Sequence, residues 1–193
     1  MISSSLRDIK PALIGFGKLM AYQDGWRDYF DVSTAGVLRS FSAAIWSLPI
    51  FILYYFCVNY FLSGLAPVDG EPIATLGLLD GVLTFVRIWV AFPIIAFVTV
   101  RILGLEALLG PWLSVHNWTV FILLHFTGFV WLIYAAGLID ENGVLIFNGF
   151  FYPVVRLFVH YRVAEGALGC HWTTALAAAG IPLVADWLLI QLI

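Results

Sequence analysis

Long apolar stretches separated by short polar connections constrain this chain more than any other feature. Such stretches cover residues 35–62, 73–103, 117–138, 143–161 and 170–193. A helix of roughly 20 apolar residues crosses the hydrocarbon layer of a membrane, so each stretch is long enough for one crossing. The chain is also 62% hydrophobic and only 11% charged, which excludes an ordinary water-soluble domain. The sequence therefore predicts an all-α, polytopic transmembrane bundle of about five spans.

The first 33 residues form the polar part of the chain. Apolar residues recur there at roughly helical spacing among Arg7, Lys10 and Lys18. We expect residues 1–33 to contain an amphipathic helix on the inner membrane surface, and residues 34–193 to form the bundle. Ser33 or Thr34 is expected to cap the first crossing. The segment has no signal-peptide pattern, so we expect Met1 to be retained.

Lysine and arginine lie on only one side of the predicted membrane, whereas the opposite loops carry acidic residues. The positive-inside rule then places the N-terminus in the cytoplasm, and an odd number of crossings places the C-terminus outside. This asymmetry is typical of a bacterial inner-membrane protein. The basic residues are Arg7, Lys10, Lys18, Arg27, Arg39, Arg101 and Arg162, and the acidic ones are Asp69, Glu71, Asp140 and Glu141.

Charged residues remain inside the predicted spans, and each costs roughly 2.5–3.5 kcal/mol at a helix centre. They are Asp80, Arg87, Arg156 and Asp186. We expect Arg87 to pair with Asp186 or with Asp80, joining the second and fifth helices at the centre of the bundle. We expect Arg156 to extend to the cytoplasmic end instead. The cluster is interpreted as a structural clasp, or alternatively as a proton or ion relay.

Small residues on the same two helices support the packing of these helices against each other or against a partner protein. The pairs Gly77 with Gly81 and Ala175 with Ala179 are small-xxx-small steps, which let neighbouring backbones approach closely. Prolines also lie inside four predicted spans, where each removes a backbone hydrogen bond and predicts a kink. They are Pro49, Pro93, Pro153 and Pro182.

All four histidines fall in the predicted cytoplasmic half, and we interpret them as interfacial residues. They are His116, His125, His160 and His171. A b-type haem is an alternative, because two imidazoles from different helices can supply both axial ligands, with His125, His160 and His171 as the candidates. The cysteines, Cys57 and Cys170, are too few for a metal cluster and are expected to be ordinary buried thiols. We therefore expect neither a metal site nor a resident cofactor, with haem, pigment or quinone as alternatives.

Catalytic signatures are missing from the sequence. There is no phosphate-binding glycine loop, HExxH, GxSxG or CxxC, and Ser114 with His116 is interpreted as an ordinary loop pair. There is no basic patch suited to nucleic acid. We therefore expect a protein that is not an enzyme, with membrane lipid and other membrane subunits as its partners.

The arrangement resembles the small five-span, Yip1-like membrane proteins of bacteria. The resemblance is carried by the span count, the RDYFDVSTAGVLRSF entry into the first helix, the HNW sequence of the third and the YRVAEGAL turn before the last. It implies a non-enzymatic inner-membrane protein and no particular functional residues. From the residues, we favour an accessory subunit, scaffold or assembly factor. The alternative is a small transporter or channel subunit that uses Asp80, Arg87 and Asp186.

Overall fold

A computed structural model describes residues 2–67, 70–71 and 73–190. Met1, Asp69 and the end of the fifth predicted span, residues 191–193, lie outside the described residues. The described part is helical and contains no β-strand. The elements in chain order are α1 (Ile2–Met20), η1 (Trp26–Tyr29), α2 (Thr34–Ser40), α3 (Ser42–Gly64), α4 (Leu78–Leu103), η2 (Glu106–Leu108), α5 (Leu109–Ala135), α6 (Glu141–Ile146), η3 (Phe147–Phe151), α7 (Tyr152–Leu168) and α8 (Trp172–Ile190).

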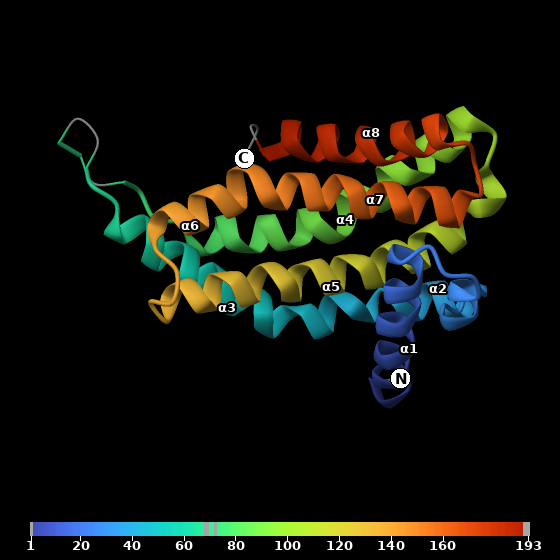
Figure 1. The fold of residues 1–193 in the computed structure, drawn as a ribbon, viewed down its shortest axis with the longest axis horizontal. Coiled ribbons are helices and arrows are strands. Elements are labelled where there is room, and N and C mark those ends of the chain that lie inside the picture. Colours follow the sequence, from blue (N-terminus) through green and yellow to red (C-terminus); the bar gives the residue numbers. More distant parts are fainter. Residues whose placement is uncertain (1, 68–69, 72, 191–193) are drawn as a thin grey trace.

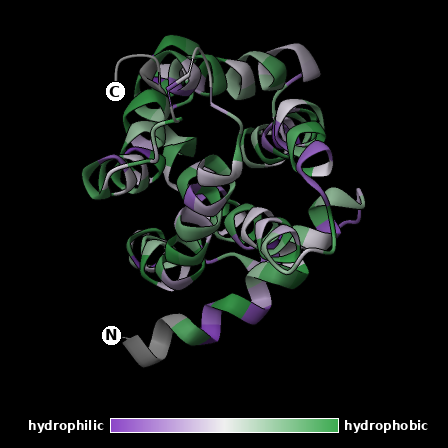
Figure 2. Ribbon diagram, turned by 90° about the vertical axis from the view of Figure 1, so that its left-hand side faces the viewer, coloured by the Kyte–Doolittle hydropathy of each residue, from purple (hydrophilic) through white to green (hydrophobic). Residues whose placement is uncertain are grey.

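The long helices α3, α4, α5, α7 and α8 lie side by side, whereas α1 lies across one end of the bundle (Figure 1). Among the described residues, four helical segments are long and apolar enough to cross a membrane. These segments are Thr34–Gly64, Leu78–Leu103, Glu106–Ala135 and Glu141–Leu168, and α8 adds a shorter apolar helix. Seen along the bundle, the helices are mostly hydrophobic, and hydrophilic residues mark α1 (Figure 2). The architecture is therefore compatible with an integral membrane protein.

The centre of the bundle is α5, and not the pair of second and fifth helices that the sequence predicted. Helix α5 packs against α3, α7, α2, α4 and α1. Its buried residues run from Trp112 to Trp131 and include the polar Ser114, Asn117 and Thr119. Helix α5 is central because its polar side chains are paired inside the protein. Asn117, for example, donates to Ser40 Oγ at 2.9 Å. A polar face buried in this way faces neighbouring helices and not lipid.

Two predicted spans are longer in the structure. Gly110 and Pro111 were interpreted as part of a loop, yet α5 begins at Leu109, because proline is tolerated in the first turn of a helix. The predicted end at Tyr161 is also wrong, since α7 continues to Leu168. Arg162 stabilises this extension by pairing with Glu165 one turn later.

The N-terminal segment docks on the end of α7 that this extension creates. Arg162 Nη2 donates to the Leu19 carbonyl at 2.8 Å, and Arg27 Nη2 donates to the Gly166 carbonyl at 2.6 Å. A Cβ atom at Gly166 would come within 2.8 Å of both Leu19 and Trp26, so glycine permits this close approach. The segment is thus held by specific contacts with the bundle.

Asp31 connects this segment to the first long helix. Its carboxylate accepts from Arg39 Nη2 at 2.5 Å and from the Ser33 backbone at 2.9 Å. Hydrogen bonds from Ser33, followed by the one from Arg39, hold the pKa of Asp31 below its ordinary value. Ser33 also caps α2, as predicted, by accepting from the Gly36 backbone at 3.1 Å.

Two glycines bring helices into close contact. A Cβ atom at Gly81 would lie 2.9 Å from the Tyr55 ring, so this position packs on α3. The predicted packing of the second helix against the fifth is present, since α4 contacts α8. Gly77 itself precedes α4 as its N-cap. On α5, a Cβ atom at Gly128 would lie 2.5 Å from Ile50. The predicted Ala175 and Ala179 are buried in the core, on a helix that packs against α7 and α4.

Candidate functional site

A cavity of about 220 Å³ lies inside the bundle, and all five long helices line it. Its walls are mostly apolar, with Phe51, Ile88, Leu123 and Leu183 among them. The polar side chains that line it are Tyr54, Thr84, Arg87, His116, Thr127, Asn148, Tyr152, Arg156, His160 and Asp186. A mostly apolar concave site with a few converging polar groups is the usual form of a small-molecule site.

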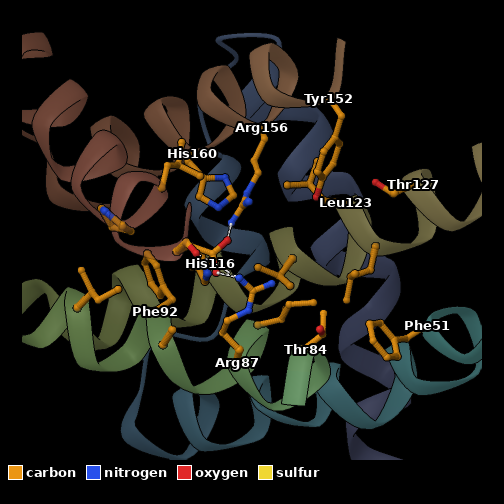
Figure 3. A pocket seen from close by; sticks show the side chains of 18 of the residues that line it. Phe51, Thr84, Arg87, Phe92, His116, Leu123, Thr127, Tyr152, Arg156 and His160 are labelled. Atoms are coloured by element: carbon orange, nitrogen blue, oxygen red, sulfur yellow. Dashed lines mark hydrogen bonds and ion pairs between the residues drawn. The ribbon is translucent and has the colours of Figure 1, made fainter. Parts of the chain in front are cut away.

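Asp186 of α8 lies between two arginines at this cavity. Its Oδ1 is 3.2 Å from Arg87 Nη1, and its Oδ2 is 2.7 Å from Arg156 Nη2. Arg87 Nη1 also donates to the Asp186 carbonyl at 3.2 Å. Figure 3 shows the two guanidinium groups converging from α4 and α7. Because the Arg87 and Asp186 side chains are each only 12% exposed, this pairing stabilises charges that would be costly alone.

Of the two pairings expected for Arg87, the structure contains the one with Asp186, and Asp80 lies apart from this pair. The predicted ion pair of Arg87 with Asp186 is present. Asp80 instead accepts from the Gly77 backbone at 2.8 Å, at the first turn of α4, where a carboxylate satisfies a free backbone donor. The prediction that Arg156 extends to the cytoplasmic end is wrong, because its guanidinium turns inward to the Asp186 carboxylate.

Two of the four histidines are buried at the cavity, contrary to their interpretation as interfacial residues. His116 stacks on Phe92, with ring centroids 3.2 Å apart and planes within 4°. His160 meets His116 edge to face at 5.1 Å. The extension of α5 carries His116 into the bundle, which is why its predicted loop position failed.

The haem candidates are not gathered into one site by their contacts. His125 Nδ1 lies 2.8 Å from the Phe121 carbonyl, one turn back on α5. His171 Nδ1 lies 3.0 Å from Thr173 Oγ1 and is exposed. In the part of the chain that the structure describes, no group of three or more His, Cys, Asp or Glu side chains could hold a metal ion.

Ser114 and His116 make separate contacts in the structure. Ser114 is buried, and its hydroxyl donates to the Asp31 carbonyl at 3.0 Å. It therefore connects α5 to the N-terminal segment. The two cysteines are free, Cys57 buried and Cys170 partly exposed, and burial raises the pKa of the Cys170 thiol.

Part of the site was overlooked in the sequence although a signal was present. Asn148, Tyr152, Arg156 and His160 recur every four residues, which is the spacing of one helix face. The segment Phe147–Phe151 forms a π-helix, and such wide turns are frequent at functional sites. A polar stripe inside an apolar span was therefore the clue to this wall of the cavity.

Comparison of the chain with protein-family models, curated proteins and solved structures returned no significant match.

Proposed function

We propose that this protein is a small transporter or channel subunit that moves a solute through its helical bundle. It is not an enzyme, and it crosses a bacterial inner membrane five times with its N-terminus in the cytoplasm. The observation that carries the proposal is the cavity of about 220 Å³, with Arg87, Arg156 and Asp186 on its walls. The resemblance to Yip1-like proteins agrees with the span count and the membrane, and does not specify the solute.

The cavity favours a solute site over a purely structural clasp. A structural clasp needs close packing of its charged groups and no open volume beside them. Here a second arginine, two histidines, Thr127 and Asn148 also line the space. Polar residues inside a membrane bundle are costly, and they typically mark substrate or ion pathways.

An accessory subunit or scaffold is the function that the sequence favours, and we give it second place. It draws support from the exposed apolar side chains on the outer faces of the helices, such as Ile94 and Phe129. Lipid covers such faces equally well in any membrane protein. The exposed faces therefore do not distinguish a partner protein from the bilayer, whereas the internal cavity requires a separate explanation.

Thiol labelling tests the proposal. In a variant with Cys57 and Cys170 replaced by alanine, we would introduce Thr127→Cys and, separately, Phe129→Cys on the same helix. Thr127 is 6% exposed and lines the cavity, whereas Phe129 is 60% exposed and would face lipid. Membrane-impermeant methanethiosulfonates, one anionic and one cationic, would be applied to proteoliposomes from each side.

A solute pathway predicts that Thr127→Cys reacts with at least one reagent and that Phe129→Cys reacts with neither. This order of reactivity is the reverse of the order of the exposed fractions. The reason is that, within the membrane, the proposed pathway places water in the cavity and lipid at Phe129. An unreactive Thr127→Cys would contradict the proposal. Rapid labelling of Phe129→Cys would contradict the membrane position of α5.

A further inference from the structure

We infer that the cavity takes a small organic monocarboxylate, with the carboxylate at the arginines and the body against the apolar wall. This inference rests on the proposed function and specifies its solute. Three features of the cavity carry it: its charge balance, its unpaired polar atoms, and the division of its surface into polar and apolar walls.

Positive charge at the cavity exceeds negative charge. The guanidinium groups of Arg87 and Arg156 face the single carboxylate of Asp186. The other titratable groups on the lining are His116, His160, Tyr54 and Tyr152. Imidazoles add no negative charge in either protonation state, and phenols are ordinarily neutral near pH 7. Among the described residues that line the cavity, one arginine charge therefore has no counterion.

An uncompensated cation within a bundle is unfavourable, so the site favours an anion. Guanidinium stays protonated and cannot reduce the cost by losing its proton. Arg156 has a side chain that is 30% exposed, more than that of either partner. Its Nη2 donates to Asp186, and because a guanidinium carries five N–H donors, it has further donors for a ligand.

Among the described residues that line the cavity, three have a buried polar atom without a hydrogen-bond partner. These atoms are Arg87 Nε, Thr127 Oγ1 and His160 Nδ1. Leaving such a group unpaired costs about 1–3 kcal/mol, and buried examples are rare in native proteins. Because Arg87 uses Nη1 for Asp186, its Nε side is the part of the fork without a partner. A carboxylate is the group that matches this fork.

The apolar wall of the cavity determines what kind of group the ligand carries beside its carboxylate. Val120, Leu123, Leu124, Ile95 and Leu183 line the cavity together with Phe51. A cavity of about 220 Å³ has room for a small organic acid. An inorganic anion would leave this apolar surface unused. The two walls together favour a monocarboxylate with a short apolar body.

Binding to the detergent-purified full chain would be measured by isothermal titration calorimetry. The probes are acetate, butyrate and benzoate, with benzamide as a neutral analogue of the same shape, benzylamine as a cation, and chloride and phosphate as inorganic anions. We expect butyrate and benzoate to bind more tightly than acetate, and the neutral, cationic and inorganic probes to bind at least tenfold more weakly than benzoate.

Variants separate recognition from folding. Arg87→Gln, which leaves Asp186 paired with Arg156, should weaken benzoate binding at least tenfold. Arg101→Gln removes the same charge from the exposed end of α4 and should leave binding unchanged. Asp186→Asn removes the carboxylate that competes with the ligand and should leave binding equal or tighter. Thr127→Val tests the hydroxyl without changing the charge and should weaken binding. A merely structural arginine would not produce these opposite effects at Arg87 and Asp186.

Equal binding of benzamide and benzoate, no binding of any carboxylate, or unchanged binding in a folded Arg87→Gln variant would overturn the inference. Tighter binding of chloride or phosphate than of benzoate would overturn the organic class. These failures differ from failure of the proposed function. A Thr127→Cys variant that is labelled while no carboxylate binds would leave the pathway in place and remove only its assigned solute.

Discussion

Replacing Asp186 by asparagine is the most direct perturbation of the charged cluster. The substitution keeps the size of the side chain and removes the charge that both arginines use. Arg87 would lose a contact of 3.2 Å and Arg156 one of 2.7 Å. Two guanidinium groups would then face each other across the cavity without an anion between them.

The expected loss of stability follows from burial. Removing one partner of a buried ion pair costs about 3–5 kcal/mol, because the remaining charge is left uncompensated. We apply this range mainly to Arg87, whose side chain is 12% exposed. The Arg156 side chain is 30% exposed, so solvent screens part of its loss. A change of 1 kcal/mol shifts the melting temperature of a domain of this size by about 2–4 °C, which predicts a decrease of about 6–20 °C.

The assay is thermal unfolding in mild detergent, followed by intrinsic tryptophan fluorescence. Asp80→Asn is the matched control, because it makes the same charge change at the first turn of α4 and away from the cavity. It should cost about 0.3–1 kcal/mol through the helix dipole. The double variant Asp186→Asn with Arg87→Gln should melt above Asp186→Asn alone, because it removes the more buried of the two unpaired cations.

A melting temperature of Asp186→Asn within 2 °C of the unmodified protein would refute the reasoning. It would mean that water or lipid compensates the arginines as well as the carboxylate does, a difference below about 1 kcal/mol on the same scale. Strict additivity in the double variant would also refute it, since residues in direct contact should be coupled. A pure relay would give a third pattern, with an unchanged fold and a loss of pH-dependent flux.

Three further predictions concern the scaffold. Gly128→Ala should cost about 1–3 kcal/mol by overpacking, whereas Gly180→Ala, where the added atom meets open space, should be neutral or stabilising in the same melting assay. Because the pKa of Asp31 is lowered in the folded protein, its stabilising contribution is present above its unfolded pKa and is lost as the pH falls through the folded value. At a given pH, pepsin should therefore cut the N-terminal segment of the Asp31→Asn variant faster than that of the unmodified protein, and the ratio of the two rates should fall toward one as the pH falls. A reporter enzyme active only outside the cytoplasm should work after Ile193 and fail after Gly166, and the reverse pattern would contradict the proposed orientation.

The sequence predicts the helices well because hydrocarbon imposes a strong rule. Backbone groups must be satisfied within each segment, so long apolar stretches become helices. The cost of an intramembrane charge likewise predicted the Arg87 and Asp186 pair. Ser33 was identified as a helix cap because its side chain can satisfy a backbone donor locally. Each success depends on a local rule or on a large energy.

The sequence-based predictions were wrong where two conformations of a residue or segment have similar energies. Arg156 can extend to the interface or turn to a buried acid, and only the position of α8 decides between them. Gly110 and Pro111 fit a loop or the first turn of a helix equally well. That ambiguity moved the start of α5 and, with it, His116. Tertiary packing settles such cases, and a single sequence carries little information about it.

The polar stripe on α7 lies between these two cases. The spacing of its residues can be seen in the sequence. The sequence of one span does not, however, determine whether Tyr152, Arg156 and His160 face a neighbouring helix or an open cavity. The distinction decides the function, because a stripe packed on a helix only stabilises, whereas a stripe beside a cavity can bind. The net positive charge of two arginines and one carboxylate, together with the open volume beside them, favours the second case. The unmatched guanidinium beside this open volume is therefore the feature that favours an anionic ligand.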